Sequence, residues 1–174
     1  MSRRLVIEIA VALILVIAVA FSAKAQVSSE FKVVYSLDNR ATDQEIVKLI
    51  NDADQYVYFA IYYFSKENIA HALIRARQRG VKVWGITDAA ASLDNNRKVV
   101  EKLRAGGIEI ETQKHLDGIM HMKAVVSDKA YASGSFNWTQ AATEANDEVL
   151  EIGTNKGVHD QYLSIIRKVL LKNQ

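Results

Sequence analysis

The stretch His121-Met-Lys-Ala-Val-Val-Ser-Asp-Lys-Ala-Tyr-Ala-Ser-Gly-Ser-Phe-Asn137 decides how this chain is interpreted. Its two short apolar runs predict strands at 120–126 and 130–133. A tight turn at 128–129 would join them as a hairpin. A small-residue turn, 134–137, follows the second strand and is expected to open a helix. The other predicted elements are placed around this hairpin.

Four side chains give the stretch its chemistry: His121, Lys123, Ser135 and Asn137. Because strand residues two apart point to the same face, His121 and Lys123 are expected to project together. An imidazole, an ammonium, a hydroxyl and a carboxamide supply a nucleophile or base and several hydrogen-bond donors, which suits a phosphoryl group. The alternative is an ordinary amphipathic hairpin with a solvated His and Lys. The presence of four such groups within one short stretch favours a site for a phosphoryl group over an ordinary hairpin.

Length and composition indicate one globular domain. The chain has 174 residues, of which 49% are hydrophobic and 24% charged, which are values typical of folded rather than disordered chains. The sequence contains no Cys, which excludes a disulfide framework, a Cys-based zinc site and a thiol nucleophile. The absence of Cys also suits an oxidising compartment.

Residues 1–25 are predicted to be a signal peptide or a membrane anchor. A basic start precedes an apolar run at 5–21, and Ala23-Lys24-Ala25 has the small-x-small pattern of a signal-peptidase site. The run is near the lower limit for crossing a bilayer, so an uncleaved helix that holds the protein at a membrane remains the alternative. Either way, the domain 26–174 is expected outside the cytoplasm, periplasmic or secreted, or membrane-anchored.

The net charge of +2 comes from this N-terminal segment. Three of the 22 Lys and Arg residues and one of the 20 Asp and Glu residues lie in 1–25, so the remainder carries 19 of each. A polyanion would therefore have to be held by local basic patches. The candidates are Arg75, Arg77, Arg79 and Lys82; Arg97, Lys98, Lys102 and Arg104; and Lys114-His115. Solvated helix faces are the alternative for each patch.

Strand and helix patterns alternate along the chain from residue 31. Strands are predicted at 31–35, 56–62, 81–86, 108–111 and 148–152, and helices from about 42, 65, 95, 138 and 158. Thr42-Asp43-Gln44-Glu45 reads as a capping box for the first helix. This order predicts an α/β fold, an α-β-α sandwich whose central sheet is mixed because the hairpin adds antiparallel pairing. The chain carries one copy of the hairpin motif and no internal repeat.

These residues resemble the phospholipase D superfamily, which carries an H-x-K-x4-D motif followed by G-S-x-N. The corresponding residues are His121, Lys123 and Asp128, followed by Gly134-Ser135-Phe136-Asn137. Residues 31–171 are similar to the small bacterial endonucleases of this superfamily that carry a single motif. Five residues separate Asp128 from Gly134, whereas the family usually has six. A hairpin turn shortened by one residue would explain the difference.

The resemblance implies a site shared between two subunits of a homodimer, with one half-site in each chain. One His121 would attack phosphorus to form a phosphohistidine, and its counterpart would protonate the leaving oxygen and then activate water. Lys123 and Asn137 would hold the phosphate oxygens, and Ser135 would donate to the phosphate or stabilise the turn. No metal or other cofactor would be required.

Two carboxylates receive roles by the same resemblance. Glu148 would orient the nucleophilic imidazole, with Glu144 and Glu151 as less well aligned candidates. Asp128 belongs to the motif, but its place in a turn favours a structural role, capping backbone N–H groups, at least as much as a catalytic one.

A metal site is the alternative to this phosphate site. His115, Asp117 and His121 could be imagined as ligands, but the ammonium of Lys123 would repel a cation. His71 and His159 are expected to be surface or core residues without a functional role. Trp138 is expected to pack in the core rather than to stack on a nucleic-acid base.

Three functions follow, in order of preference. The first is a nonspecific endonuclease acting on DNA or RNA. The second is a phospholipase or cardiolipin-type hydrolase, which a retained N-terminal anchor would favour. The third is an inactive nucleic-acid-binding module, against which the intact His121, Lys123 and Asn137 argue.

Overall fold

The computed structural model describes residues 30–89, 95–113 and 118–174. The strands are β1 (Phe31–Tyr35), β2 (Tyr56–Ile61), β3 (Lys82–Asp88), β4 (Glu109–Gln113), β5 (Lys123–Ser127), β6 (Tyr131–Gly134) and β7 (Val149–Gly153). The helices are α2 (Ser36–Asn39), α3 (Thr42–Asp52), α4 (Glu67–Gln78), α5 (Asn95–Ala105), α6 (Gln140–Glu144) and α7 (Lys156–Lys172). Residues 1–25, predicted to be a signal or anchor, lie outside the described residues.

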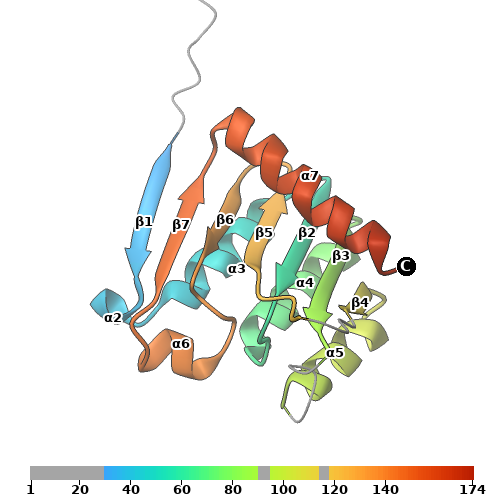
Figure 1. Cartoon of the computed structure of the whole chain (residues 1–174), viewed down its shortest axis with the longest axis horizontal. Helices are drawn as coiled ribbons and strands as arrows, with labels where there is room; N and C mark the ends of the chain where they lie inside the picture. Colours follow the sequence, from blue (N-terminus) through green and yellow to red (C-terminus); the bar gives the residue numbers. More distant parts are fainter. Residues whose placement is uncertain (1–29, 90–94, 114–117) are drawn as a thin grey trace, which may run out of the picture.

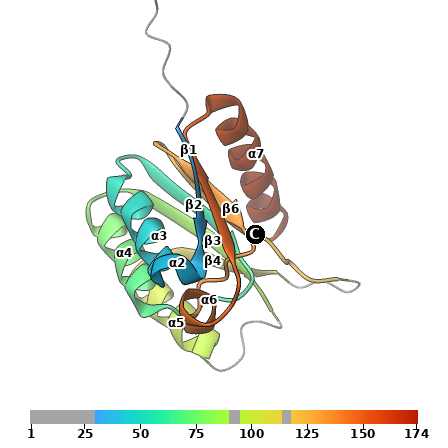
Figure 2. The ribbon, with the colours of Figure 1, turned by 90° about the vertical axis from the view of Figure 1, so that its left-hand side faces the viewer.

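The strands form one mixed sheet in the order β1-β7-β6-β5-β2-β3-β4 (Figure 1). β2, β3 and β4 run parallel, because a helix crosses over between each pair, and the remaining neighbours are antiparallel. Helices cover the sheet unevenly: α2 to α6 lie on one side, whereas α7 lies alone on the other (Figure 2). The predicted α-β-α sandwich with a mixed sheet is confirmed.

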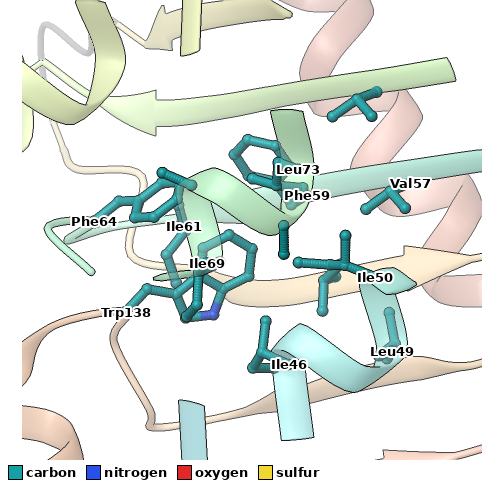
Figure 3. Packing of buried hydrophobic residues seen from close by; sticks show 14 of the residues in the cluster. Ile46, Leu49, Ile50, Val57, Phe59, Ile61, Phe64, Ile69, Leu73 and Trp138 are labelled. Carbon is teal, nitrogen blue, oxygen red and sulfur yellow. The ribbon is translucent and has the colours of Figure 1, made fainter. Parts of the chain in front are cut away.

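Two apolar cores separate the sheet from its helices. The larger core lies between the sheet and α3 and α4, where Phe59, Phe64 and Trp138 pack with ring centroids 4.8 to 6.1 Å apart (Figure 3). The smaller core lies under α7, which contributes Ile166 and Leu170. The wholly apolar run of β2 is explained by these two cores, because its residues alternate between them.

The central hairpin is shifted from its predicted position by one to three residues. His121 precedes β5 rather than belonging to it. The chain is diverted there because the Asp88 carboxylate accepts a hydrogen bond from the Met120 N–H group at 2.7 Å. Val126 pairs with Tyr131 across the turn, and this register, continued to the end of the hairpin, brings Gly134 beside Lys123. The five-residue spacer is therefore accommodated by a tight turn.

The predicted capping box at the start of α3 is wrong. The N-cap is Ala41, without a side-chain cap, and within the described residues the buried Thr42 hydroxyl has no hydrogen-bond partner. Glu45, the carboxylate that would complete the box, pairs instead with Lys32, and the neighbouring Asp43 pairs with Lys66. The short helix expected from residue 138 begins at Gln140, capped by the Thr139 hydroxyl.

Within residues 30–89, 95–113 and 118–174, every helix is too short or too polar to cross a bilayer.

Candidate active site

The motif residues other than Asp128 lie at one edge of the sheet, where β2 ends, β5 begins and β6 ends (Figure 1). His121 lies just before β5 and is exposed, whereas Lys123 is the first residue of β5 and is buried. The Lys123 ammonium group donates a hydrogen bond to the His121 carbonyl oxygen at 2.9 Å. Both side chains lie near the same aromatic ring, that of Tyr62, although only Lys123 belongs to the strand.

Tyr62 connects the two basic residues. Its ring centroid lies 4.8 Å from the centroid of the His121 imidazole, and the Lys123 Nζ atom lies 5.1 Å from the same phenol ring. The Tyr62 N–H group also donates to the Met122 carbonyl oxygen at 2.9 Å, which continues the β2–β5 pairing into the site. One aromatic ring therefore contacts both basic groups of the motif, through a tilted ring–ring contact and a cation–π contact.

Lys123 occupies a partly desolvated position. Burial lowers the pKa of its ammonium group, and the negative charge of Glu148 opposes that shift without cancelling it. An ammonium group buried in this way attracts an anion more strongly than one in bulk solvent.

Ser135 and Glu148 form a hydrogen-bonded pair beside this cation. The Ser135 hydroxyl donates to one Glu148 carboxylate oxygen, and the side chain of Asn146 donates to the other at 3.2 Å. The Ser135 oxygen in turn accepts from the Val149 N–H group at 3.1 Å. Among the described residues no hydrogen bond joins Glu148 to His121. Glu148 instead orients the turn at Ser135 and places a negative charge near Lys123.

Asn137 faces the same edge from the start of the 137–139 turn. Its side-chain oxygen accepts a hydrogen bond from the Tyr63 N–H group at 3.2 Å, which fixes the orientation of the carboxamide. The NH₂ group, for which no partner occurs among the described residues, is then the donor left for a ligand.

Asp128 lies at the opposite end of β5, five residues or roughly 16 Å from Lys123 at the rise of an extended strand. Its carboxylate accepts hydrogen bonds from the Asp54 and Gln55 N–H groups at 3.0 and 3.1 Å. Burial raises the pKa of Asp128, but these backbone donors outweigh burial and hold the pKa below its ordinary value of 3.8. This arrangement supports the structural role rather than the catalytic one.

We therefore expect Asp128→Ala to lower the free energy of unfolding by about 2 kcal/mol, because the Asp54 and Gln55 N–H groups lose a charged acceptor. Asp52→Ala, which removes an exposed ion pair with Lys48, should cost less than about 0.5 kcal/mol. Because the folded pKa is depressed, the Asp128 contribution is present above pH 3.8 and is lost as the pH falls through the folded value. Urea unfolding at pH 7 and pH 3 measures both effects; an equal cost at the two pH values would contradict this assignment.

The predicted basic patches are largely engaged in holding the fold. Arg79 donates to the Ile50, Asn51 and Ala53 carbonyl oxygens, and Arg104 donates to the Ile110 carbonyl oxygen. Lys102 pairs with Glu67, Arg97 pairs with Glu101, and Arg77 donates to the Gly107 carbonyl oxygen. These contacts favour the alternative reading, in which the helix faces are structural, over a ready-made polyanion surface.

The remaining sequence candidates fall outside the site. Trp138 is buried in the larger core, as predicted. His71 is exposed on α4, and His159 faces the Ser127 carbonyl oxygen at 2.7 Å. Residues 114–117, which include His115, Asp117 and the Lys114-His115 patch, lie outside the described residues.

Sequence reasoning missed Tyr62 and Asn146. An aromatic residue at the carboxyl end of a buried strand was a usable signal for Tyr62, since ligands of open α/β sheets bind at that edge. No local signal marks Asn146, whose role depends on the turn that returns the chain from α6 to β7.

The chain is similar to known proteins over most of its length. A family model described as "Cardiolipin synthase, PLD-like domain" matches residues 46–170. A phospholipase D of Rickettsia conorii is 33% identical over 119 residues, which cover 68% of this chain and 58% of that protein. A mitochondrial cardiolipin hydrolase of Mus musculus is 33% identical over 88 residues, covering 51% of this chain and 39% of that protein. The chain thus spans less than two thirds of these relatives.

Two solved structures share the fold. Nuc from Salmonella typhimurium, described as a phospholipase D family member, has a TM-score of 0.77 at 23% identity and covers 84% of this chain and 96% of its own. NucT from Helicobacter pylori has a TM-score of 0.76 at 26% identity and covers 84% and 98%. The family model that matches residues 46–170 shows that the chain belongs to the phospholipase D superfamily of phosphodiesterases, and the shared fold agrees with it.

Proposed function

We propose that this protein hydrolyses phosphodiesters without a metal ion, through a covalent phosphohistidine on His121. The observation that supports this most directly is the contact of one Tyr62 ring with both an exposed imidazole and a desolvated ammonium group. The imidazole is a nucleophile, and the ammonium group and the Asn137 NH₂ group are donors for the non-bridging oxygens of a phosphate.

The reaction divides into two displacements at phosphorus. In the first, an unprotonated His121 nitrogen forms a bond to phosphorus, and the bond from phosphorus to the leaving oxygen breaks. The leaving oxygen takes a proton from the second imidazole. In the second step that imidazole removes a proton from water, whose oxygen displaces the first imidazole from phosphorus. Lys123 offsets the charge that develops on the phosphate oxygens in both steps.

The second imidazole is supplied by a second copy of the chain, because the sequence carries one motif. An open sheet face supports this dimer: Phe31, Val33, Tyr35 and Val149 are 61%, 55%, 38% and 40% exposed. They lie on the α7 side of the sheet, since Phe31 pairs with Gly153 and Gly153 is covered by Tyr131, whose ring stacks on α7. Exposed apolar patches of this kind mark protein interfaces. Val149 contacts Ser135, so this open sheet face adjoins the site.

Val33→Glu should accordingly convert a dimer into monomers and remove most of the activity, because it places a charge in the apolar contact. Gln78→Glu adds the same charge on α4, on the far side of the sheet, and should change neither property. Sedimentation velocity and hydrolysis of bis-p-nitrophenyl phosphate measure the two outcomes. A monomeric wild-type protein with full activity would contradict the shared site.

For the substrate we propose nucleic acid, DNA or RNA. The support is the likeness in fold and length to Nuc and NucT, each covered almost completely by this chain, and the resemblance of the single motif to small bacterial endonucleases. The named relatives, a phospholipase D and a cardiolipin hydrolase, keep a lipid phosphodiester as the second candidate.

The test incubates the purified protein with plasmid DNA, single-stranded DNA, RNA and cardiolipin vesicles, all in EDTA. Cleavage of nucleic acid in EDTA is expected. Activity that appears only when a divalent cation is added would contradict the metal-free reaction. Cleavage of cardiolipin alone would make lipid the substrate, and binding of nucleic acid without cleavage would indicate an inactive binding module.

Tyr62 is proposed to position both basic groups. Tyr62→Leu should lower kcat about 10- to 100-fold, with KM little changed, because the imidazole and the ammonium group lose their common support. Tyr62→Phe keeps the ring and should retain most of the activity. The pH profile distinguishes positioning from a general packing defect, because loss of the cation–π contact should move the alkaline limb of kcat/KM to lower pH. Equal losses in the two variants would assign the effect to the hydroxyl.

We propose that the domain acts outside the cytoplasm, on the evidence of the basic and apolar N-terminal sequence. Expression of the full chain in a bacterial host, followed by fractionation and N-terminal sequencing, tests this. A mature protein that starts at Gln26 would indicate a cleaved signal, retention of residues 5–21 in the membrane fraction would indicate an anchor, and full-length protein in the cytoplasm would contradict both.

A further inference from the structure

The C-terminal half of α7 and the loop before β5 form an unusual surface. Three large aliphatic side chains are exposed there: Ile119, Ile165 and Leu171, at 52%, 48% and 56%. A groove of about 460 Å³ runs between the helix and the loop, and its lining includes Met122, Val169 and His121. The groove therefore reaches the residue that carries the proposed chemistry.

Among the described residues, the charged side chains on the C-terminal half of α7 all have one sign. Arg167, Lys168 and Lys172 are exposed on α7, and none of the three forms an ion pair within the part of the chain that the structure describes. The one acidic residue of α7, Asp160, lies in its N-terminal half and is paired there with Lys156 and His159. This end of the helix is thus cationic and apolar together.

We propose that this surface, Ile119, Ile165 and Leu171 with Arg167, Lys168 and Lys172, binds the surface of an anionic lipid bilayer. Exposed aliphatic side chains enter the boundary between head groups and acyl chains, while lysine and arginine next to them meet lipid phosphates. Docking in this way places His121 at the level of the head groups. The proposal does not depend on whether lipid or nucleic acid is cleaved.

The composition of the groove favours lipid over nucleic acid as the partner. A surface for single strands stacks bases on aromatic rings, but no phenylalanine, tyrosine or tryptophan lines this groove. A surface for duplex phosphates has no use for three exposed aliphatic side chains between its cations. The proposed dimer contact also leaves this surface open, because the open sheet face is at the β1 edge and this half of α7 crosses β2 and β3 (Figure 1).

The absence of cysteine from the chain allows a site-specific test. Leu171→Cys and Ile165→Cys, in the full chain, each carry one environment-sensitive fluorophore, with Lys48→Cys on the opposite layer as the matched control. Vesicles of phosphatidylglycerol and phosphatidylcholine should shift the emission of the first two probes to the blue and leave the control unchanged. Vesicles of phosphatidylcholine alone should give little shift. Replacing Lys168 or Lys172 by Gln should raise the vesicle concentration at half-maximal shift about fivefold for each lysine.

Three results would overturn the proposal. A blue-shifted emission at position 171 before vesicles are added would mean that protein, such as a second copy, covers the surface. A shift of the Lys48→Cys probe equal to the others would mean nonspecific adsorption or insertion of another segment. A shift produced by duplex DNA but not by anionic vesicles would assign the surface to nucleic acid.

Discussion

His121→Ala is expected to lower phosphodiester hydrolysis by at least about 10⁴-fold. The substitution removes the nucleophile and, in the proposed dimer, the general acid as well, so both steps lose their reacting group. The imidazole is exposed and contacts one ring, that of Tyr62, so the fold should persist with its free energy of unfolding changed by less than about 1 kcal/mol.

The matched control for this substitution is His71→Ala. That imidazole is also exposed, but it lies on α4 and has Glu67 as its charged neighbour. Initial rates on plasmid DNA and bis-p-nitrophenyl phosphate, with thermal unfolding of each variant, separate chemistry from stability. Residual activity above a few per cent in His121→Ala, at unchanged stability, would remove His121 from the role of nucleophile.

Lys123→Met is expected to separate activity from stability. Methionine occupies a similar volume without the charge, so the turnover rate should fall about 10²- to 10³-fold, because the phosphate oxygens lose a desolvated cation. Stability should stay the same or increase, since burying an ammonium group is unfavourable for folding and an apolar side chain avoids that cost. A large loss of stability would mean that Lys123 serves mainly to hold the hairpin.

The lowered pKa of Lys123 also gives the wild-type enzyme a pH signature. The cation is required for activity, so kcat/KM should fall on the alkaline side at a pH below 10.5, the ordinary value for lysine. In Lys123→Arg the side chain remains charged at all accessible pH values, so this limb should disappear even if the rate is lower. An alkaline limb that persists unchanged in Lys123→Arg would assign it to another group.

The fold was largely predictable because its pattern is strong and regular. The apolar run of β2 and the helices ended at Gly80 and Gly107 follow from local sequence, and these give a parallel sheet with crossovers. The capping box failed because Glu45 and Asp43 found partners 13 and 23 residues away, which local sequence does not reveal. The uneven distribution of helices over the two faces of the sheet could not be predicted either, because it depends on where α7 packs.

The candidate site, too, was predictable only in part. The spacing of His121 and Lys123 predicted that they lie near one another, but strand geometry applies only to Lys123, because His121 precedes β5. The ring contact of Tyr62 with His121 and the hydrogen bond between Ser135 and Glu148 depend on strands that come together at one edge of the sheet. No single segment of the sequence contains all of these residues. Asp128 shows the limit of motif reasoning, since the residue is part of the motif but stands at the other end of β5.

The most direct test of the covalent reaction is to trap its intermediate. The wild-type protein is mixed with excess bis-p-nitrophenyl phosphate, denatured within milliseconds at alkaline pH, where phosphohistidine survives, and digested for mass spectrometry. The account predicts a p-nitrophenyl phosphoryl group on the peptide that contains His121, formed with the first release of nitrophenol and absent from His121→Ala. An unmodified His121 during steady turnover, or an adduct on another residue that persists in His121→Ala, would contradict it.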